Sequence, residues 1–427
     1  MKGSLSTRWV VTAWWVICLV WASAARSADR DHLIFRAETV AGVEVASTRP
    51  DVPFNPASVV KVGTSLWALD RLGPDFRYET SVGYIGEFDP DACSVRGALV
   101  VGGQGDPDFH LENAFLVARS LNGLGVRRVD GDLAVTGSFF MGWENGVERG
   151  DGFAGERALV MGARLLNALD VSRWTTRQRQ AWMELCARRG WDPATPPSVS
   201  FTGGVRYVTD PGKVRPLVTH LSNPLPVVLR RFNVYSNNDI IRISDGLGGA
   251  AVLTEFLRLR LAVEPPDELE LSTASGQNRN RMTARVAVRL MREFQTELET
   301  HGLELDDVLP IPGCDPGPTR RMFPTLANDP LGPRAVVKTG TLTTTDGGVV
   351  VLAGAFSNSD LGTVFFCVSA TRTGREIARW RSAEEAWLLD LMKSVAGVTP
   401  RACGPELPFS SSDAMVVESG AQPAVVD

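Results

Sequence analysis

The chain has 427 residues, of which 44% are hydrophobic and 22% charged. That composition can bury a globular core in two or three domains and excludes overall disorder. The formal net charge is −5 and the sequence pI is near 5.6, which argues against nucleic acid as the main partner. The four histidines are scattered along the chain, so their spacing indicates neither a metal cluster nor a histidine-based triad.

The first 28 residues have the layout of a secretory signal. Lys2 and Arg8 precede an apolar run of about 14 residues that ends at Ala22, and small residues follow it. A membrane-spanning helix needs about 20 apolar residues, so an uncleaved N-terminal anchor is the weaker alternative. We therefore expect export to the periplasm or another extracytoplasmic location, with no stable membrane span after cleavage. Cleavage after Ala24, Ala25 or Ala28 would satisfy the small-residue rule.

Five cysteines remain after the signal is removed, an odd and widely spaced set without a CxxC pair. The sequence therefore gives poor support to a disulfide framework or a zinc site. The pairing state stays open for each of Cys93, Cys186, Cys314, Cys367 and Cys403.

The N-terminal part of the mature chain predicts two short strands and then a helix. Residues 32–48 alternate as strands with a turn near Ala41 and Gly42, and residues 55–74 carry apolar side chains at helical intervals. Gly73 and Pro74 are the expected cap and stop of that helix. Residues 83–220 change character, with short strands, two helical segments and many turn residues, and we interpret them as an inserted domain.

The C-terminal half predicts helices followed by a three-stranded meander. Residues 222–249 form a helix, a break at 235–238 and a second helix, and residues 282–298 form another helix. Apolar runs at 334–342, 347–356 and 362–370 are separated by hairpin-type linkers, and a long helix covers 375–395. The predicted main domain is therefore 29–82 with 221–400, and the polar tail 401–427 is expected to be disordered.

Ser58 and Lys61 lie one turn apart at the start of the helix predicted for residues 55–74. Only five lysines occur in the chain, against 39 arginines. A neutral lysine can take a proton from a serine hydroxyl, whereas an arginine stays protonated. The helix N-terminus would also favour a developing oxyanion. The pair therefore suggests a nucleophile and its base, although an isolated SxxK is also common on amphipathic helices.

A second lysine occurs in Lys338-Thr339-Gly340, within a predicted strand. Such a strand could bind an extended peptide along its edge, with Gly340 allowing close approach and Lys338 and Thr339 holding an anionic terminus. By itself, the triplet could equally be a strand with one solvated lysine.

A Ser-x-Asn triplet occurs twice. Ser120-Leu121-Asn122 lies near the end of a predicted helix, where polar residues are ordinary. Ser236-Asn237-Asn238 lies in a break between helices, where side chains can point into a cleft, and we favour it as the site.

The three triplets occur in the order SxxK, SxN, KTG, the set found in class A β-lactamases and penicillin-binding proteins. With FNPASVVKVGTSLWALDRLGPDFRYET, VVGGQGDPDF, LRRFNVYSNNDI and AVVKTGTLTTTDGG, the chain resembles the D-alanyl-D-alanine carboxypeptidases and endopeptidases of the class C, low-molecular-mass penicillin-binding proteins. The resemblance covers roughly residues 30–395. It implies an α/β (α+β) fold of the β-lactamase/transpeptidase type, with an antiparallel sheet flanked by helices, a helical subdomain and an inserted domain.

The resemblance also implies roles for single residues. Ser58 would be the acylated nucleophile with Lys61 as its base, Ser236 would relay the leaving-group proton, and Asn238 would hold the substrate amide. Lys338, Thr339, Gly340 and Thr341 would bind the substrate, with the N–H groups of Ser58 and Thr341 forming the oxyanion hole. Peptidoglycan stem peptides would be the substrates and β-lactams the inhibitors, and the reaction would need no metal or organic cofactor.

The chain departs from this family's usual pattern at three places. The interval from Ser58 to Ser236 is short, TASGQN at 273–278 replaces DGSGLS, and LPIPGCDPGPT at 309–319 replaces LPVAGxDGTL. Two other functions stay open, namely a β-lactamase or esterase of the same fold and a non-catalytic cell-wall-binding protein. The sequence does not separate carboxypeptidase from endopeptidase activity and gives no oligomeric state.

Overall fold

The computed structural model describes residues 32–146, 154–264, 266–404 and 406–419. These residues form two compact units. The first comprises the described residues within 1–66, 233–236 and 250–405, and the second those within 67–232, 237–249 and 406–427. The predicted inserted domain, 83–220, falls within the second unit. The division into domains stays a prediction, because compactness alone does not show which segments fold independently.

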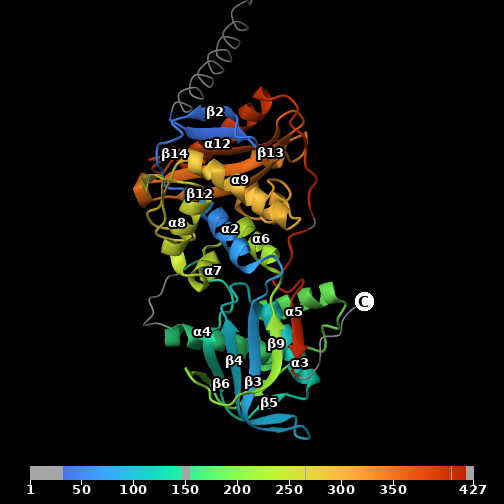
Figure 1. The fold of residues 1–427 in the computed structure, drawn as a ribbon. Helices are drawn as coiled ribbons and strands as arrows, with labels where there is room; N and C mark the ends of the chain where they lie inside the picture. Colours follow the sequence, from blue (N-terminus) through green and yellow to red (C-terminus); the bar gives the residue numbers. More distant parts are fainter. Residues whose placement is uncertain (1–31, 147–153, 265, 405, 420–427) are drawn as a thin grey trace, which may run out of the picture. The chain divides into compact units, whose positions relative to one another are not determined.

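The first unit is built on a five-stranded antiparallel sheet with the order β12-β13-β14-β1-β2 (Figure 1). The three strands of the predicted meander are β12 (Ala335–Leu342), β13 (Val349–Asn358) and β14 (Gly362–Thr371). The predicted N-terminal strands are β1 (Ile34–Thr39) and β2 (Glu44–Thr48), and Gly42 makes the turn between them with φ 80°. Among the described residues β12 pairs only with β13, so its other edge has no strand pairing in this part of the chain.

Helices cover both faces of this sheet, which explains why its central strands are buried along nearly their whole length. Alternate side chains of β13 and β14, such as Leu352 and Phe366, pack with Trp387 of α12 (Ile377–Ser394). On the other face, α9 (Ala284–Thr300) lies against β1, β13 and β14, and its Arg292 donates to Glu38 over 2.7 Å. Both helices are visible beside the sheet in Figure 1.

Besides the sheet and its two covering helices, the first unit contains parts of two further helices and several short elements. The helix α2 (Val60–Leu72) begins in this unit and runs into the second, whereas α6 (Leu225–Tyr235) ends in it. The other short elements are η1 (Ala57–Val59), α8 (Gly249–Arg260), η5 (Pro266–Glu268), β10 (Leu269–Glu270), β11 (Arg281–Met282), η6 (Leu305–Asp307), α10 (Pro318–Met322), α11 (Pro324–Ala327) and η7 (Thr345–Gly347).

The second unit is a mixed sheet packed with helices around its own core. Its central path is β15-β9-β3-β4-β5-β7, and β6 pairs with β4 and β8. Phe115 of the helix α3 packs against Trp174 and Trp182, with ring centroids 4.8 and 5.8 Å away. The elements are β3 (Glu79–Asp89), β4 (Ser94–Gln104), α3 (Leu111–Gly123), β5 (Arg128–Val129), β6 (Leu133–Ser138), α4 (Ala154–Leu169), η3 (Val171–Arg173), α5 (Thr176–Arg189), β7 (Ser200–Phe201), β8 (Val205–Tyr207), β9 (Arg215–Leu221), η4 (Asn238–Ile240), α7 (Ile241–Gly246) and β15 (Met415–Glu418).

The strand β15 shows that part of the tail 401–427, which is predicted to be disordered, has regular structure. Residues 405 and 420–427 of this tail lie outside the described residues. Residues 415–418 pair antiparallel with β9, from Met415 opposite Leu221 to Glu418 opposite Val218. The side chains of Arg77 and Arg189 also donate to backbone carbonyls at Asp413 and Ser411. The polar composition of the tail suggested disorder, but backbone pairing does not require apolar side chains.

The predicted signal segment, 1–28, lies outside the described residues. Among the residues that are described, no helix is long and apolar enough to cross a membrane.

Candidate active site

Ser58 lies in a single 3-10 turn, Ala57–Val59, that leads directly into α2. Ala57 has a positive φ of 47°, an unusual conformation for a residue with a side chain. The Asn55 side chain supports this turn by accepting from the N–H of Ala57 over 3.1 Å. The chain thus places Ser58 at the N-terminus of a helix, where backbone N–H groups and the helix dipole favour negative charge.

Ser58 and Lys61 are in hydrogen-bonding contact. Lys61 Nζ lies 2.7 Å from Ser58 Oγ and 2.6 Å from the carbonyl oxygen of Ser275. The Lys61 side chain is completely buried, while Ser58 is half-buried. Burial, and then the nearby charge of Lys338, hold the pKa of the Lys61 amine well below its usual value. The Lys61 amine can therefore be neutral while it lies in hydrogen-bonding contact with the Ser58 hydroxyl.

A second serine–lysine pair joins the loop after α6 to the strand β12. Lys338 Nζ donates to Ser236 Oγ over 2.8 Å and to the carbonyl oxygen of Thr339 over 2.9 Å. Lys338 is 1% exposed, and burial together with the charge of Arg381 lowers its pKa to about 7. Near neutral pH this amine therefore changes between its charged and neutral forms.

Two glycines allow other segments to approach the turn that carries Ser58. A Cβ atom added to Gly340 would lie 2.6 Å from the carbonyl oxygen of Pro56 and 3.1 Å from the Ser58 nitrogen. One added to Gly276 would lie 1.9 Å from the carbonyl oxygen of Ala57. Neither position can accept a side chain without moving the turn. The glycine of KTG thus places β12 directly beside the proposed nucleophile.

Thr339 and Thr341 follow Lys338 along β12, at the edge of the sheet with which no other described strand pairs. Thr339 is 4% exposed, and Thr341 is half-buried. An unpaired strand edge presents N–H and C=O groups that an extended peptide can bind. The first unit therefore brings together seven of the eight predicted site residues, namely Ser58, Lys61, Ser236, Lys338, Thr339, Gly340 and Thr341.

The eighth residue, Asn238, belongs to the second unit, where it begins the turn Asn238–Ile240. Its role stays a prediction. The rejected alternative, Ser120, lies within α3, and its neighbour Asn122 donates to the carbonyl oxygens of Val126 and Ser198 over 2.9 and 2.8 Å. Asn122 thus has a structural function, consistent with the choice of the other triplet.

Sequence reasoning missed the polar residues that hold the Ser58 turn. Asn55 donates to the carbonyl oxygen of Asn278 over 2.8 Å and to Asp346 Oδ2 over 2.9 Å. Arg281 also donates to Asp346 Oδ2, over 3.1 Å. Asn280 in turn fixes the 272–280 loop by accepting from the N–H groups of Ser272 and Thr273 over 2.9 and 3.2 Å. These contacts join residues far apart in the sequence, so no local pattern predicts them. The one available signal is the position of Asn55, three residues before the SxxK serine, which could have suggested that Asn55 supports the site.

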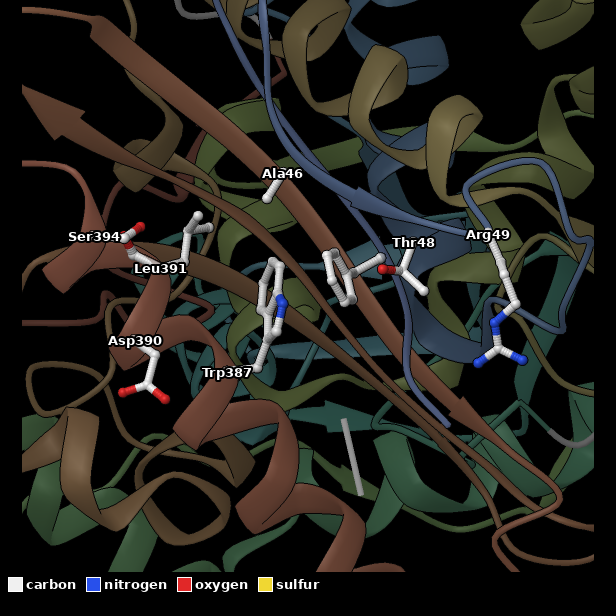
Figure 2. A pocket seen from close by; sticks show the side chains of 8 residues that line it. Ala46, Thr48, Arg49, Trp387, Asp390, Leu391 and Ser394 are labelled. Atoms are coloured by element: carbon white, nitrogen blue, oxygen red, sulfur yellow. The ribbon is translucent and has the colours of Figure 1, made fainter. Parts of the chain in front are cut away.

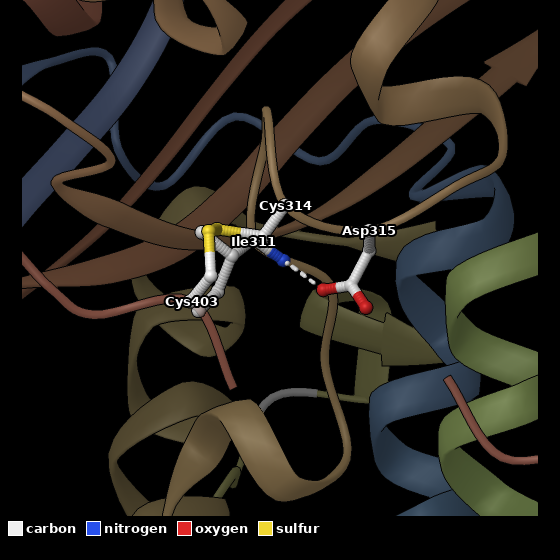
Figure 3. Close-up of a disulfide and its surroundings, with 4 residues drawn as sticks. All are labelled: Ile311, Cys314, Asp315 and Cys403. Atoms are coloured by element: carbon white, nitrogen blue, oxygen red, sulfur yellow. Dashed lines mark hydrogen bonds between the residues drawn. A yellow bond between two sulfur atoms is a disulfide. The ribbon is translucent and has the colours of Figure 1, made fainter. Parts of the chain in front are cut away.

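One disulfide, between Cys314 and Cys403, is present in the described part of the chain (Figure 3). This bridge was not predicted, because the five cysteines form an odd, widely spaced set without a CxxC pair; the two that pair are 89 residues apart. The bridge fixes the loop that departs from the family pattern, in which Asp315 accepts from the N–H of Ile311 over 2.8 Å. Cys93, Cys186 and Cys367 are free thiols.

A pocket of about 520 Å³ lies elsewhere in the first unit, between β2 and α12. Figure 2 shows Trp387 and Asp390 on one side of this pocket and Thr48 and Arg49 on the other. It contains none of the predicted site residues. No group of three or more potential metal-ligating His, Cys, Asp or Glu side chains occurs among the described residues.

Solved structures of similar fold include an endopeptidase and a penicillin-binding protein. A predatory peptidoglycan endopeptidase from Bdellovibrio bacteriovorus matches with a TM-score of 0.71 and 19% identity, over 90% of this chain and 98% of its own. Its penicillin G-acylated form, in complex with an immunity protein, matches with a TM-score of 0.68 over the same shares. Penicillin-binding protein 4 from Haemophilus influenzae matches with a TM-score of 0.57 and 17% identity, over 85% of this chain and 99% of its own. These likenesses confirm the predicted fold class.

The sequence itself matches the D-Ala-D-Ala carboxypeptidase 3 (S13) family over residues 33–152 and 197–387, which together make up more than half of the chain. The matched ranges contain the SxxK, SxN and KTG triplets. The match also confirms the predicted enzyme class, a serine-type peptidase. The chain thus belongs to the D-Ala-D-Ala carboxypeptidase 3 (S13) family.

Proposed function

We propose that this protein hydrolyses D-alanyl peptide bonds of peptidoglycan stem peptides through an acyl-enzyme intermediate on Ser58. The observation that carries the proposal is the 2.7 Å contact between Ser58 Oγ and the buried Lys61 amine, whose pKa is held well below its usual value. A serine hydroxyl becomes an effective nucleophile only when an adjacent base can take its proton.

Acylation begins when the neutral Lys61 amine takes the hydroxyl proton as Ser58 Oγ attacks the carbonyl carbon of the penultimate D-alanine. The negative charge that develops on the carbonyl oxygen is stabilised by the N–H groups of Ser58 and Thr341. Breakage of the peptide bond then releases the terminal amine, which takes up a proton, and leaves the acyl group esterified to Ser58. Water hydrolyses this ester and restores the serine.

Ser236 and Lys338 act on the leaving-group side of the bond. Ser236, held 2.8 Å from Lys338 Nζ, passes a proton to the departing amine. The charged amine of Lys338 attracts the terminal carboxylate of the substrate, and Thr339 helps to hold that carboxylate. Asn238 holds the substrate amide, as the family resemblance implies.

β-Lactams are the expected covalent inhibitors, because they would acylate the same serine. The fold is shared with an endopeptidase that has been obtained as a penicillin G adduct. The substrate occurs in the cell wall, and the N-terminal segment has a signal layout, so the enzyme is proposed to act in the periplasm or another extracytoplasmic space.

Mass spectrometry after incubation with penicillin tests the proposal. We expect one adduct of penicillin mass on a peptide containing Ser58 in the wild type and none in Ser58→Ala. Ser120→Ala is a matched control that should retain the adduct, because this serine lies in the rejected SxN triplet. Absence of labelling in folded protein, or labelling that persists in Ser58→Ala, would refute the assignment of the nucleophile.

Digestion of purified muropeptides separates the remaining alternatives. Release of free D-alanine from pentapeptides indicates carboxypeptidase activity, whereas cleavage of cross-linked dimers to monomers indicates endopeptidase activity. Rapid turnover of penicillin without a lasting adduct would instead favour a β-lactamase. Retention on peptidoglycan without any cleavage would favour a binding protein.

A further inference from the structure

A buried ion pair lies behind the strand that carries the KTG triplet. Arg381 and Glu384 lie one turn apart on α12, with Arg381 Nη1 2.6 Å from Glu384 Oε2. Their side chains are 4% and 0% exposed. Burying two charges costs solvation free energy, and apolar residues in their place are often equally stable. The proposed catalytic steps do not use this pair, so its presence needs another explanation.

Arg381 connects α12 to the backbone and to one side chain of β12. Its Nη2 donates both to the carbonyl oxygen of Gly340 and to Thr341 Oγ1. Its Nη1 also donates to the carbonyl oxygen of Val351, on the neighbouring strand β13, over 3.0 Å. A guanidinium has five N–H groups in a fixed plane, so it can hold these acceptors in one arrangement.

The first consequence concerns the proposed oxyanion hole. The carbonyl of Gly340 and the N–H of Thr341 belong to the same peptide group, and in a trans peptide they point in opposite directions. A cation bonded to that carbonyl therefore fixes the direction of the N–H and polarises it, which strengthens it as a donor.

The second consequence concerns the Thr341 hydroxyl. A guanidinium can donate but cannot accept, so Thr341 Oγ1 must act as the acceptor toward Arg381. The hydroxyl proton then has to point toward a different acceptor. Within the described part of the chain no hydrogen bond is made by this proton, and a substrate carboxylate at the sheet edge would be a suitable acceptor.

We propose that Arg381 is a positioning residue that aligns both donors of Thr341, its N–H for the oxyanion and its O–H for the terminal carboxylate of the substrate. The inference rests on the proposed function and deepens it. It explains how Arg381, without touching the substrate, makes the enzyme select acyl donors that carry a terminal carboxylate. Burial, and then the charge of Arg381, lower the pKa of the neighbouring Lys338 amine.

Two thioester substrates that differ in one group test this role. The leaving group is thioglycolate in the first substrate and its methyl ester in the second, so only the first carries a carboxylate. We expect Arg381→Lys to lower kcat/KM for both by about tenfold or more, since the oxyanion peptide is less firmly held. The preference for the acid over the ester should fall by roughly a further tenfold.

Thr341→Val separates the two donors, because it removes the hydroxyl and keeps the N–H. It should lower the acid-to-ester preference by about the same factor and leave the rate with the ester nearly unchanged. In the double variant Arg381→Lys with Thr341→Val, the preference should fall no further than in either single variant, because both changes remove one interaction. If the double variant instead loses preference by the product of the two single-variant factors, the two residues act independently and the proposal is overturned.

Arg36→Lys is the matched control for a buried arginine. Arg36 is also paired with a buried acid, Glu38, over 2.9 Å, but it lies on β1. The Arg36→Lys variant should have a changed melting temperature and an unchanged preference for the acid over the ester substrate. If Arg381→Lys does not fold, Arg381→Gln with Glu384→Gln removes both charges together and leaves neither unpaired. An unchanged preference in that folded pair variant would equally overturn the proposal.

The wild type distinguishes this inference from the function on which it rests. Turnover of the acid thioester that is lost in Ser58→Ala supports the proposed function, whatever Arg381→Lys does. If the wild type turns over neither thioester and takes no penicillin, the proposed function itself fails.

Discussion

Two serine–lysine pairs meet in the first unit, and they are nearly alike in distance but not in surroundings. Lys61 Nζ is 2.7 Å from Ser58 Oγ, and Lys338 Nζ is 2.8 Å from Ser236 Oγ. Both amines are almost completely buried. Ser58, however, lies at a helix N-terminus beside the close-packed backbone of β12, whereas Ser236 lies in a loop with a φ of 52°.

The difference shows that contact between a serine and a lysine does not by itself define a nucleophile. Ser58 lies in the turn that begins α2, where the backbone N–H groups of a helix start favour a developing oxyanion. Lys338 instead retains access to its charged form near neutral pH, because its pKa is about 7. We infer that the first pair performs the nucleophilic step and the second manages the leaving group and the carboxylate.

Replacing each lysine by arginine should give the largest contrast. Lys61→Arg should lower the rate of acylation by about a thousandfold or more, because a guanidinium cannot accept the serine proton. Lys338→Arg keeps the positive charge and should cost only about tenfold. Stopped-flow acylation with a chromogenic β-lactam measures both, and equal losses in the two variants would contradict the division of roles.

Adding one methyl group at Gly340 should disturb the first pair through the backbone. Gly340→Ala places a Cβ atom 2.6 Å from the carbonyl oxygen of Pro56, so the turn carrying Ser58 must shift. We expect a roughly hundredfold lower acylation rate, since small misplacements of reacting groups have effects of this size. Gly246→Ala, at an open position without a positive φ, is the control and should leave acylation unchanged. Unchanged acylation in Gly340→Ala would show that the close approach is not needed.

The pH dependence of kcat/KM should separate the two lysines. Raising the pH through about 7 removes the charge of Lys338 in the folded enzyme. Activity with a carboxylate-bearing thioester should therefore decrease above pH 7, by at most about tenfold per pH unit. The corresponding methyl ester should show no such decrease, and its activity should fall only on the acid side, where Lys61 becomes protonated. Parallel profiles for the two substrates would contradict a role of Lys338 in binding the carboxylate.

The smallest effect is expected in stability. The pKa of Lys338 is about 7 in the fold and about 10.4 in an unfolded chain, so between these values the unfolded state binds more protons. The free energy of unfolding therefore rises with pH across this window and is reduced on its acid side. Lys338→Met should raise the free energy of unfolding at pH 7 by about 1–4 kcal/mol, with a gain that shrinks toward pH 9. Urea denaturation at both pH values measures this, and a destabilised variant would show that the amine contributes net stability.

Much of the site could be predicted because its residues occur in short local patterns. SxxK requires only helical spacing, and KTG requires only a strand with one glycine, so both could be assigned from the sequence and both have the expected local structure. The three strands of the meander and the turn at Gly42 were predictable for the same reason, since turn residues mark their ends.

The supporting residues could not be predicted because their contacts join distant segments. Arg381 occurs in a helix that the sequence predicts. The residues around it in the sequence, however, do not indicate that its guanidinium donates to the carbonyl oxygen of Gly340, 41 residues earlier. The disulfide between cysteines 89 residues apart and the pairing of β15 with β9 could not be predicted for the same reason, because each joins distant segments. Sequence patterns specify elements, whereas the packing of those elements specifies which buried polar groups find partners.

The strand β15 has a practical consequence for handling the protein. Its four residues cover the outer edge of β9, and that edge would otherwise present unpaired N–H and C=O groups to other molecules. A version shortened before Met415 would therefore be prone to self-association through β9, even though every predicted site residue lies earlier in the chain. A purification tag attached after the C-terminal residues is better joined through a flexible spacer, so that β15 can still pair with β9.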